Sequence, residues 1–137
     1  MIRRPFVLLL AAAPGLSTLA LAHANDMAGM SPKGKGTTIT GEVVDTGCYL
    51  GHAARGEKHI GCATKCVNNG MPMGLLTADG RLYLLTLNHD DADPYNQLKG
   101  MLGKNAAVTG VVMERAGMKG IDVTGARLAA AVPAAKK

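Results

Sequence analysis

The sequence GLLTADGRLYLLTL, at residues 74–87, is the clearest local structural signal in the chain. Two short apolar runs, 74–77 and 81–87, flank an Asp-Gly pair, which favours the left-handed backbone of a tight hairpin turn. Upstream of this hairpin, residues 38–45 (TITGEVVD) are β-branched and bounded by turn residues, so they predict a first strand. These two signals indicate a mainly β domain.

Downstream of the hairpin, the sequence predicts a short helix and then more strands. Asp93 offers an N-cap side chain, Pro94 suits the first helical position, and apolar residues then recur at helical spacing. Residues 104–115 and 119–128 return to β character around a glycine-containing turn. We expect them to form a closing hairpin.

The expected order of elements matches the OB-fold, which has five strands in a Greek-key barrel. We predict a small five-stranded OB-fold-like barrel over residues 38–128, with a cysteine-bearing helix inserted after strand 1 and a short helix between strands 3 and 4. The chain has one phenylalanine, three tyrosines and no tryptophan, so its core should be aliphatic with some methionine. The residues expected to be buried are Val43, Leu75, Leu84, Val108, Val111 and Ile121.

The N-terminal residues 1–24, MIRRPFVLLLAAAPGLSTLALAHA, read as a cleavable secretory signal peptide. They combine a basic start, an apolar stretch and small residues in Ala-x-Ala spacing, with cleavage expected after Ala22 or Ala24. Arg3 and Arg4 also resemble the twin-arginine export motif, and ordinary export stays open as the alternative. We therefore expect a periplasmic or secreted protein that has no membrane span after cleavage.

The segments on either side of the predicted domain have no regular apolar pattern. Residues 25–37 are rich in Gly, Pro and Lys and predict a flexible linker, and residues 129–137 predict a disordered tail. The formal net charge is +5, and removal of Arg3 and Arg4 leaves 13 basic and 10 acidic residues. This weak excess, without clustered basic residues or aromatic stacking platforms, argues against nucleic-acid binding. The sequence also lacks a nucleophile elbow, a phosphate loop and a zinc-protease helix, so nothing indicates a hydrolase.

The candidate chemistry lies in the insert after the first strand, which contains all three cysteines of the chain: Cys48, Cys62 and Cys66. Residues 57–69 (EKHIGCATKCVNN) have a composition that suits a helix, and Gly70 suits its end. At about 100° per residue, His59, Cys62 and Cys66 share one face of this helix. We expect Cys48, on the preceding loop, to fold over that face.

Three thiolates and one imidazole suit tetrahedral Zn²⁺, or Cu(I) where fewer ligands bind. Met71 and Met73, which follow the cysteine helix, add an argument for copper because thioethers prefer Cu(I). A metal requires the Cys48 sulfur to lie within about 4 Å of both helix sulfurs, because Zn–S bonds are near 2.3 Å. The predicted metal ligands are Cys48, His59, Cys62 and Cys66, with His52 as the substitute for His59.

Two alternatives to a metal site remain open. In an oxidising compartment Cys48 could pair with Cys62 or Cys66, which requires a sulfur–sulfur distance of about 2 Å. The cysteines could instead be inert and packed beside Ala63 and Val67 under the sheet. The expected function is therefore an exported metal-binding module for copper or zinc, or else a thiol-redox or disulfide-stapled interaction domain without metal. Its expected partner is a metal ion or an unidentified periplasmic protein.

Three short motifs carry a resemblance to a family. They are Gly-x-Val-Val-Asp-x-x-Cys-Tyr at residues 41–49, Cys-x-x-x-Cys at residues 62–66 and Gly-Leu-Leu-Thr at residues 74–77. The set resembles uncharacterised bacterial exported (periplasmic) proteins of OB-fold-like type. The resemblance implies export and the barrel fold, and no settled function comes with it.

Overall fold

The computed structural model describes residues 31–130. The predicted signal peptide with both cleavage positions, residues 25–30 of the predicted linker and residues 131–137 of the predicted tail lie outside the described residues. Within residues 31–130, none of the helices has the length and apolar character needed to cross a membrane.

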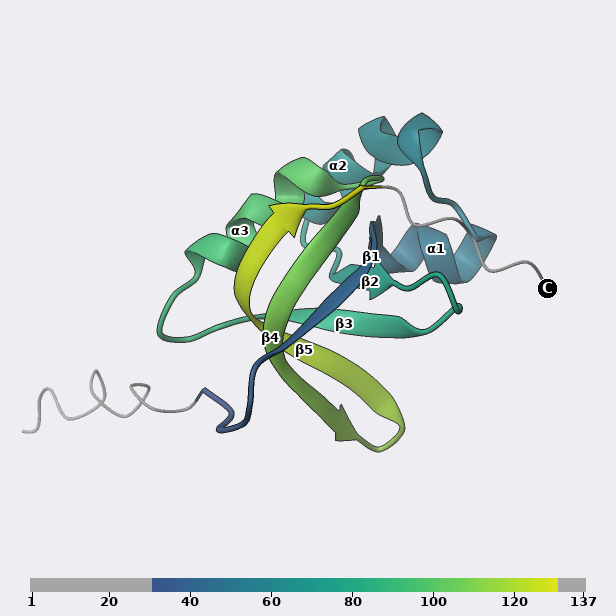
Figure 1. Cartoon of the computed structure of the whole chain (residues 1–137). Helices are drawn as coiled ribbons and strands as arrows, with labels where there is room; N and C mark the ends of the chain where they lie inside the picture. The colour runs from purple at the N-terminus through teal and green to yellow at the C-terminus, as the bar shows by residue number, and fades with distance from the viewer. Residues whose placement is uncertain (1–30, 131–137) are drawn as a thin grey trace, which may run out of the picture.

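The described chain is mainly β, as predicted, and contains a five-stranded sheet (Figure 1). Its strands are β1 (Thr37–Asp45), β2 (Met73–Leu76), β3 (Leu82–Leu87), β4 (Asn105–Arg115) and β5 (Met118–Leu128). β1 pairs antiparallel with both β2 and β4, β2 with β3, and β4 with β5, whereas β3 and β5 are parallel. The neighbours run β1-β2-β3-β5-β4, and the pairing of β4 with β1 closes the sheet on itself.

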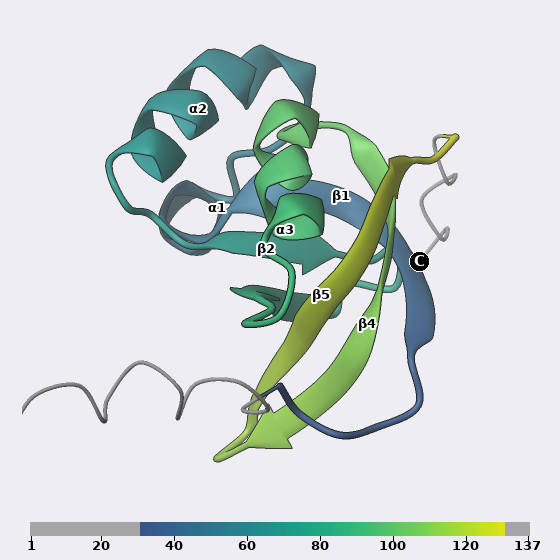
Figure 2. The same ribbon diagram turned by 90° about the vertical axis from the view of Figure 1, so that its left-hand side faces the viewer.

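Three α-helices interrupt the strands at two places. Helices α1 (Thr46–His52) and α2 (Ile60–Asn68), with the 3₁₀ turn η1 (Glu57–His59) between them, connect β1 to β2. Helix α3 (Asp93–Leu98) and the 3₁₀ turn η2 (Lys99–Met101) connect β3 to β4. Figure 2 shows α1, α2 and α3 grouped at one end of the sheet, while the β4–β5 hairpin extends past the other end. The cysteine helix and the helix after the third strand therefore lie at the predicted points in the chain.

Helix α1 corrects the prediction that Cys48 lies on a loop. The Asp45 side chain accepts a hydrogen bond from the backbone N–H of Cys48 and so caps the N-terminus of α1. At the other end Ala53 adopts a left-handed conformation, and its N–H is bonded to carbonyls of the last turn. This helix is only two turns long, too short for its apolar residues to show a helical period in the sequence.

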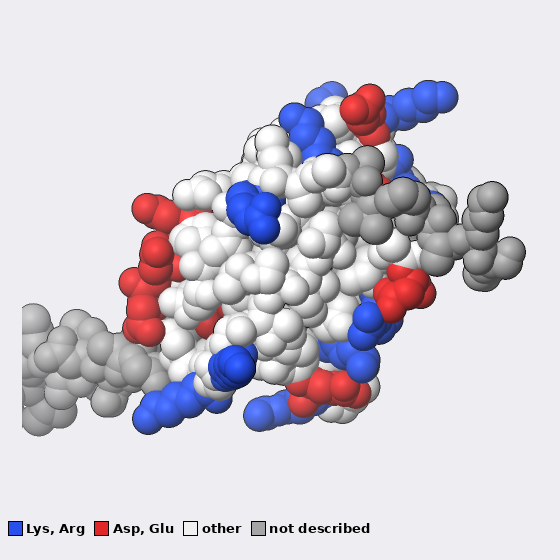
Figure 3. Space-filling model, in the orientation of Figure 1, with Lys and Arg blue, Asp and Glu red and all other residues white. Residues whose placement is uncertain are grey.

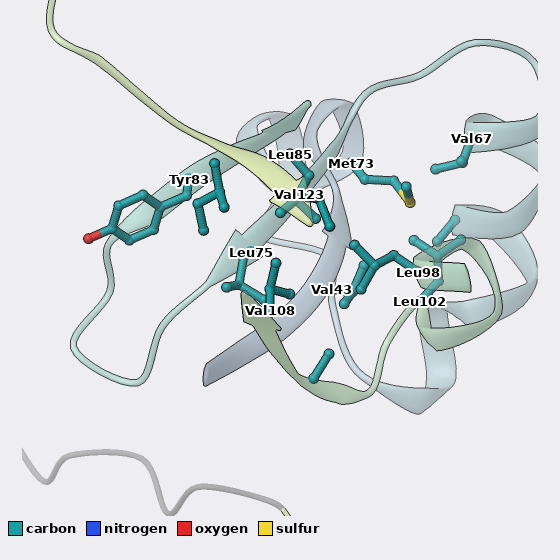
Figure 4. Packing of buried hydrophobic residues seen from close by; sticks show 13 residues of the cluster. Val43, Val67, Met73, Leu75, Tyr83, Leu85, Leu98, Leu102, Val108 and Val123 are labelled. Carbon is teal, nitrogen blue, oxygen red and sulfur yellow. The ribbon is translucent and has the colours of Figure 1, made fainter. Parts of the chain in front are cut away.

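The core is formed by the inner face of the sheet together with α2, α3 and the chain after η2 (Figure 4). Four of the expected core residues are fully buried: Val43, Leu75, Val108 and Ile121. Leu84 and Val111 are only partly buried. In β3 the buried positions are Tyr83 and Leu85, so the predicted register of this strand was wrong by one residue. β3 has apolar residues on both faces, so its sequence does not alternate between apolar and polar residues and does not indicate which face points inward.

Candidate metal centre

The three cysteine sulfurs converge from two helices. Cys48 lies on α1, and Cys62 and Cys66 lie one turn apart on α2. The three Sγ atoms are all within 4.8 Å of one another, and the Cys48 and Cys66 Sγ atoms are 3.9 Å apart. The buried face of α2 consists of Ala63 and Val67, which pack into the core. The packing of that face turns the two cysteines of α2 towards α1.

These distances distinguish between the alternatives for the cysteines. All three are free thiols, and 3.9 Å is far beyond the disulfide bond length of about 2.05 Å. No disulfide is therefore present in this reduced state. The alternative of inert burial is wrong for Cys62, because Cys62 is exposed and only Ala63 and Val67 are buried on α2. The sulfurs of a tetrahedral zinc site are about 3.8 Å apart. The three cysteines are therefore close enough together to hold a metal ion.

Asp45 is a further site residue that the sequence analysis did not identify. Its side chain is completely buried, although it is a carboxylate at the end of β1. Oδ1 accepts the backbone N–H of Cys48 at 2.8 Å, and Oδ2 lies 3.0 Å from Nε2 of His59. Ligand atoms of Asp45, Cys48 and His59 all lie within 4.8 Å of one another. Cys48 is therefore shared by two groups of possible ligands.

The hydrogen bonds around Asp45 determine which groups are charged. Burial alone would raise the pKa of the Asp45 carboxyl, but hydrogen bonds from Cys48 and His59 outweigh burial and hold this pKa below its usual value of 3.8. The hydrogen bond with Asp45, followed by desolvation, raises the pKa of Cys48 to about 12. Without metal, Cys48 is therefore a neutral thiol beside a buried anion at neutral pH. The buried negative charge of Asp45 favours the binding of a metal cation, which would displace the proton of the Cys48 thiol.

Cys66 titrates in the same direction as Cys48. The hydrogen bond with Cys48 lowers the pKa of the Cys66 thiol, but desolvation and the neighbouring Cys62 outweigh it and raise the pKa overall. A reactive catalytic cysteine needs the opposite, a depressed pKa in an electropositive environment. The pKa directions of Cys48 and Cys66 thus suit ligands that lose their protons to a metal better than they suit catalytic nucleophiles.

The two predicted histidines have different environments. His59, on η1, lies beside Asp45 and Cys48, but it is not grouped with Cys62 and Cys66. Its position is supported by its backbone N–H, which donates to the carbonyl of Gly56, while the N–H of Gly56 donates to the Glu42 side chain. His52 is exposed in the last turn of α1 and belongs to neither group.

The two methionines after the cysteine helix also differ. Met73 is completely buried in the core and lies among its side chains in Figure 4. Met71 packs on Gly47, the residue before Cys48, where an added Cβ would come within 2.6 Å of the Met71 sulfur. Gly47 therefore leaves room for Met71 beside the start of α1.

The charged side chains on the face drawn in Figure 3 are unevenly distributed. Several Asp and Glu side chains lie together at the left edge of this view, whereas the Lys and Arg side chains lie elsewhere, either singly or beside Asp and Glu. No protein-family model matches the chain, and no curated protein or solved structure matches it. The chemistry of the site is thus the principal guide to function.

Proposed function

We propose that this protein binds a thiophilic metal ion, copper(I) or zinc, through Cys48, Cys62 and Cys66. The observation that carries the proposal is the convergence of three sulfurs from α1 and α2, with Cys48 and Cys66 3.9 Å apart. Metal–sulfur bonds of about 2.3 Å place the sulfurs of trigonal and tetrahedral sites about 3.8–4.0 Å apart. An ion can therefore bind with only small movements of the two helices.

His59 distinguishes the two metals. Zinc in structural sites takes four ligands, whereas soft Cu(I) accepts three thiolates. If Nε2 of His59 donates its proton to Asp45, Nδ1 has the free lone pair that a metal needs. A carboxylate behind a histidine is the usual arrangement around zinc ligands. A zinc site with four protein ligands thus needs His59 to turn Nδ1 towards the three sulfurs while Asp45 holds Nε2, and Cu(I) binding needs no fourth ligand.

Metal titration of the reduced, metal-free protein tests the proposal. Zn²⁺ and Cu(I) are added separately in competition with a chromophoric chelator of known affinity. We expect one equivalent to bind to the wild type and stoichiometric binding to be lost in Cys66→Ser. His52→Ala is the matched control, since this histidine lies in the same insert but outside both ligand groups. Unchanged metal content in Cys66→Ser would end the proposal.

Two further variants identify the metal. His59→Ala should weaken zinc binding and leave Cu(I) binding unchanged, because only zinc needs the fourth ligand. Asp45→Asn should weaken zinc binding about 10–100-fold, the usual effect of losing a partner behind a metal ligand. Circular dichroism of both variants shows whether the fold is kept. Weakened Cu(I) binding in a folded His59→Ala would contradict this division between the metals.

Residues 1–24 support a location outside the cytoplasm, because they have the three parts of a secretory signal. We infer that the site operates in the periplasm or after secretion, where its partner is the metal ion or a protein that exchanges it. N-terminal sequencing of the exported protein should begin at His23 or Asn25. Exported material that starts at Met1 would contradict the signal peptide.

We also infer that the sheet is an OB-fold-like barrel. The supporting observations are the closed order β1-β2-β3-β5-β4 and the helix between β3 and β4. Both are features of the five-stranded Greek-key barrel of this fold. On this inference the metal site lies on an insertion between the first two strands, at one end of the barrel.

A further inference from the structure

We propose that Cys48 and Cys66 form a reversible disulfide, and that the exposed Cys62 is the thiol that first reacts with an external disulfide. This redox activity uses the sulfurs of the proposed metal site but requires no metal. It assigns different roles to the three thiols.

The geometry favours Cys48 and Cys66 as the final pair. Their sulfurs are in contact at 3.9 Å and belong to different helices, so a bond between them can form by side-chain rotation together with small shifts of α1 against α2. Cys62 and Cys66 are on the same helix, one turn apart, where the backbone holds the Cα atoms about 6 Å apart. That separation is towards the long end of the range found for disulfides. A bond between α1 and α2 is therefore easier to form than a bond within α2.

The exposure of the three thiols assigns the first step to Cys62. Cys62 is exposed, whereas Cys48 and Cys66 are only partly accessible. A disulfide from solution must reach the attacking sulfur in line, so access determines which thiol reacts first. Because all three sulfurs lie within 4.8 Å, an oxidised Cys62 is within reach of the other two after small side-chain movements.

The reaction consists of three thiol–disulfide exchanges. The Cys62 thiolate attacks an external disulfide, forms a mixed disulfide and releases one external thiol. The Cys66 thiolate then attacks the Cys62 sulfur and expels the second external thiol. Finally the Cys48 thiol gives up its proton as its sulfur attacks the Cys66 sulfur, and Cys62 is freed. The external disulfide gains two electrons and the two protons lost by Cys48 and Cys66, and one new bond joins these residues.

The disulfide has a consequence for the metal site, which rests on the proposed function. A bridge between Cys48 and Cys66 removes two of the three thiolates that would bind the ion. Oxidation and metal occupancy therefore exclude each other, and reduction restores the site.

Peptide mapping of the full chain tests the proposal. Reduced protein in chelator is incubated without oxygen with oxidised glutathione, free thiols are alkylated, and the protein is digested with trypsin. Cleavage after Arg55, Lys58 and Lys65 places each cysteine on its own peptide. We expect a Cys48–Cys66 linkage with Cys62 alkylated. A stable linkage that contains Cys62, a persistent glutathione adduct or three alkylated thiols would overturn the proposal.

Variants test the role of Cys62 separately. Cys62→Ser should form the same Cys48–Cys66 disulfide several-fold more slowly, and Asn68→Ser, an exposed polar change on the same helix, should react at the wild-type rate. Oxidation of Cys62→Ser at the wild-type rate would refute the role of Cys62.

The redox result is independent of the metal result. A protein that forms the Cys48–Cys66 disulfide but binds neither zinc nor Cu(I) supports this inference and ends the proposed function. A protein that binds metal but forms no such disulfide keeps the proposed function and overturns the inference.

Discussion

Replacement of Asp45 by alanine should destabilise the metal-free protein by about 2 kcal/mol. Loss of the N-cap hydrogen bond to Cys48 at 2.8 Å should cost about 1 kcal/mol. Loss of the acceptor for His59 at 3.0 Å should cost about 1 kcal/mol more, because this ring is largely buried. For a domain of this size the change corresponds to a fall in the midpoint of thermal unfolding of about 8–16 °C.

Urea unfolding with reductant and chelator measures this loss without any contribution from metal or disulfide. Asp45→Asn should be less destabilised than Asp45→Ala, because the amide keeps an acceptor for the Cys48 N–H. Asp90→Ala is the matched control, since this aspartate is exposed; its stability should lie within about 0.5 kcal/mol of the wild type. An Asp45→Ala variant as stable as Asp90→Ala would refute the capping role of Asp45.

Two other predictions concern the β4–β5 pairing and the turn between β2 and β3. Gly110→Ala should destabilise the protein by about 1–3 kcal/mol, because its Cβ would lie 2.1 Å from the backbone oxygen of Asp122. Gly120→Ala, with its nearest atom at 3.4 Å, should change stability little, and equal urea midpoints for the two variants would contradict this contrast. The Arg81 guanidinium lowers the pKa of Asp79 to about 2. This ion pair therefore stabilises the fold at pH values above 3.8, the usual carboxyl pKa, and its contribution is lost as the pH falls through about 2. Urea unfolding should therefore show Asp79→Asn less stable than the wild type at pH 7 and the difference disappearing below about pH 2; a difference that persists there would contradict the ion pair.

The sequence predicted those parts of the fold that depend on local signals. The hairpin between β2 and β3 follows from its Asp-Gly turn, and Gly80 indeed has a positive φ. The sequence also predicted the short helix after β3, with Asp93 as its N-cap. In the structure Ala92 is the N-cap and Asp93 is the first helical residue. Helix ends are defined only to within a residue or two by such patterns. The register of β3 needed the packed core, because Leu82 and Leu84 are as apolar as Leu85.

The site was predicted in part. A helical period alone placed Cys62 and Cys66 on one face, since that relation depends only on the geometry of α2. Asp45 was overlooked, although an aspartate three residues before Cys48 is the spacing of an N-cap to its N3 N–H. The capping pattern was a signal in the sequence, but nothing in it predicted that the same carboxylate would be buried and bonded to His59.

The sequence by itself therefore determined the strands, the cysteine helix and the candidate ligands, because these depend on residue types and spacings within short segments. Only the tertiary structure decided how the ligands meet. The distance between Cys48 and Cys66 depends on the capping of α1 by Asp45 and on the packing of Ala63 and Val67 against the core. The capping contact is local, but the packing contacts join residues far apart in the sequence, and their geometry arises only when the sheet closes and the helices pack at its end.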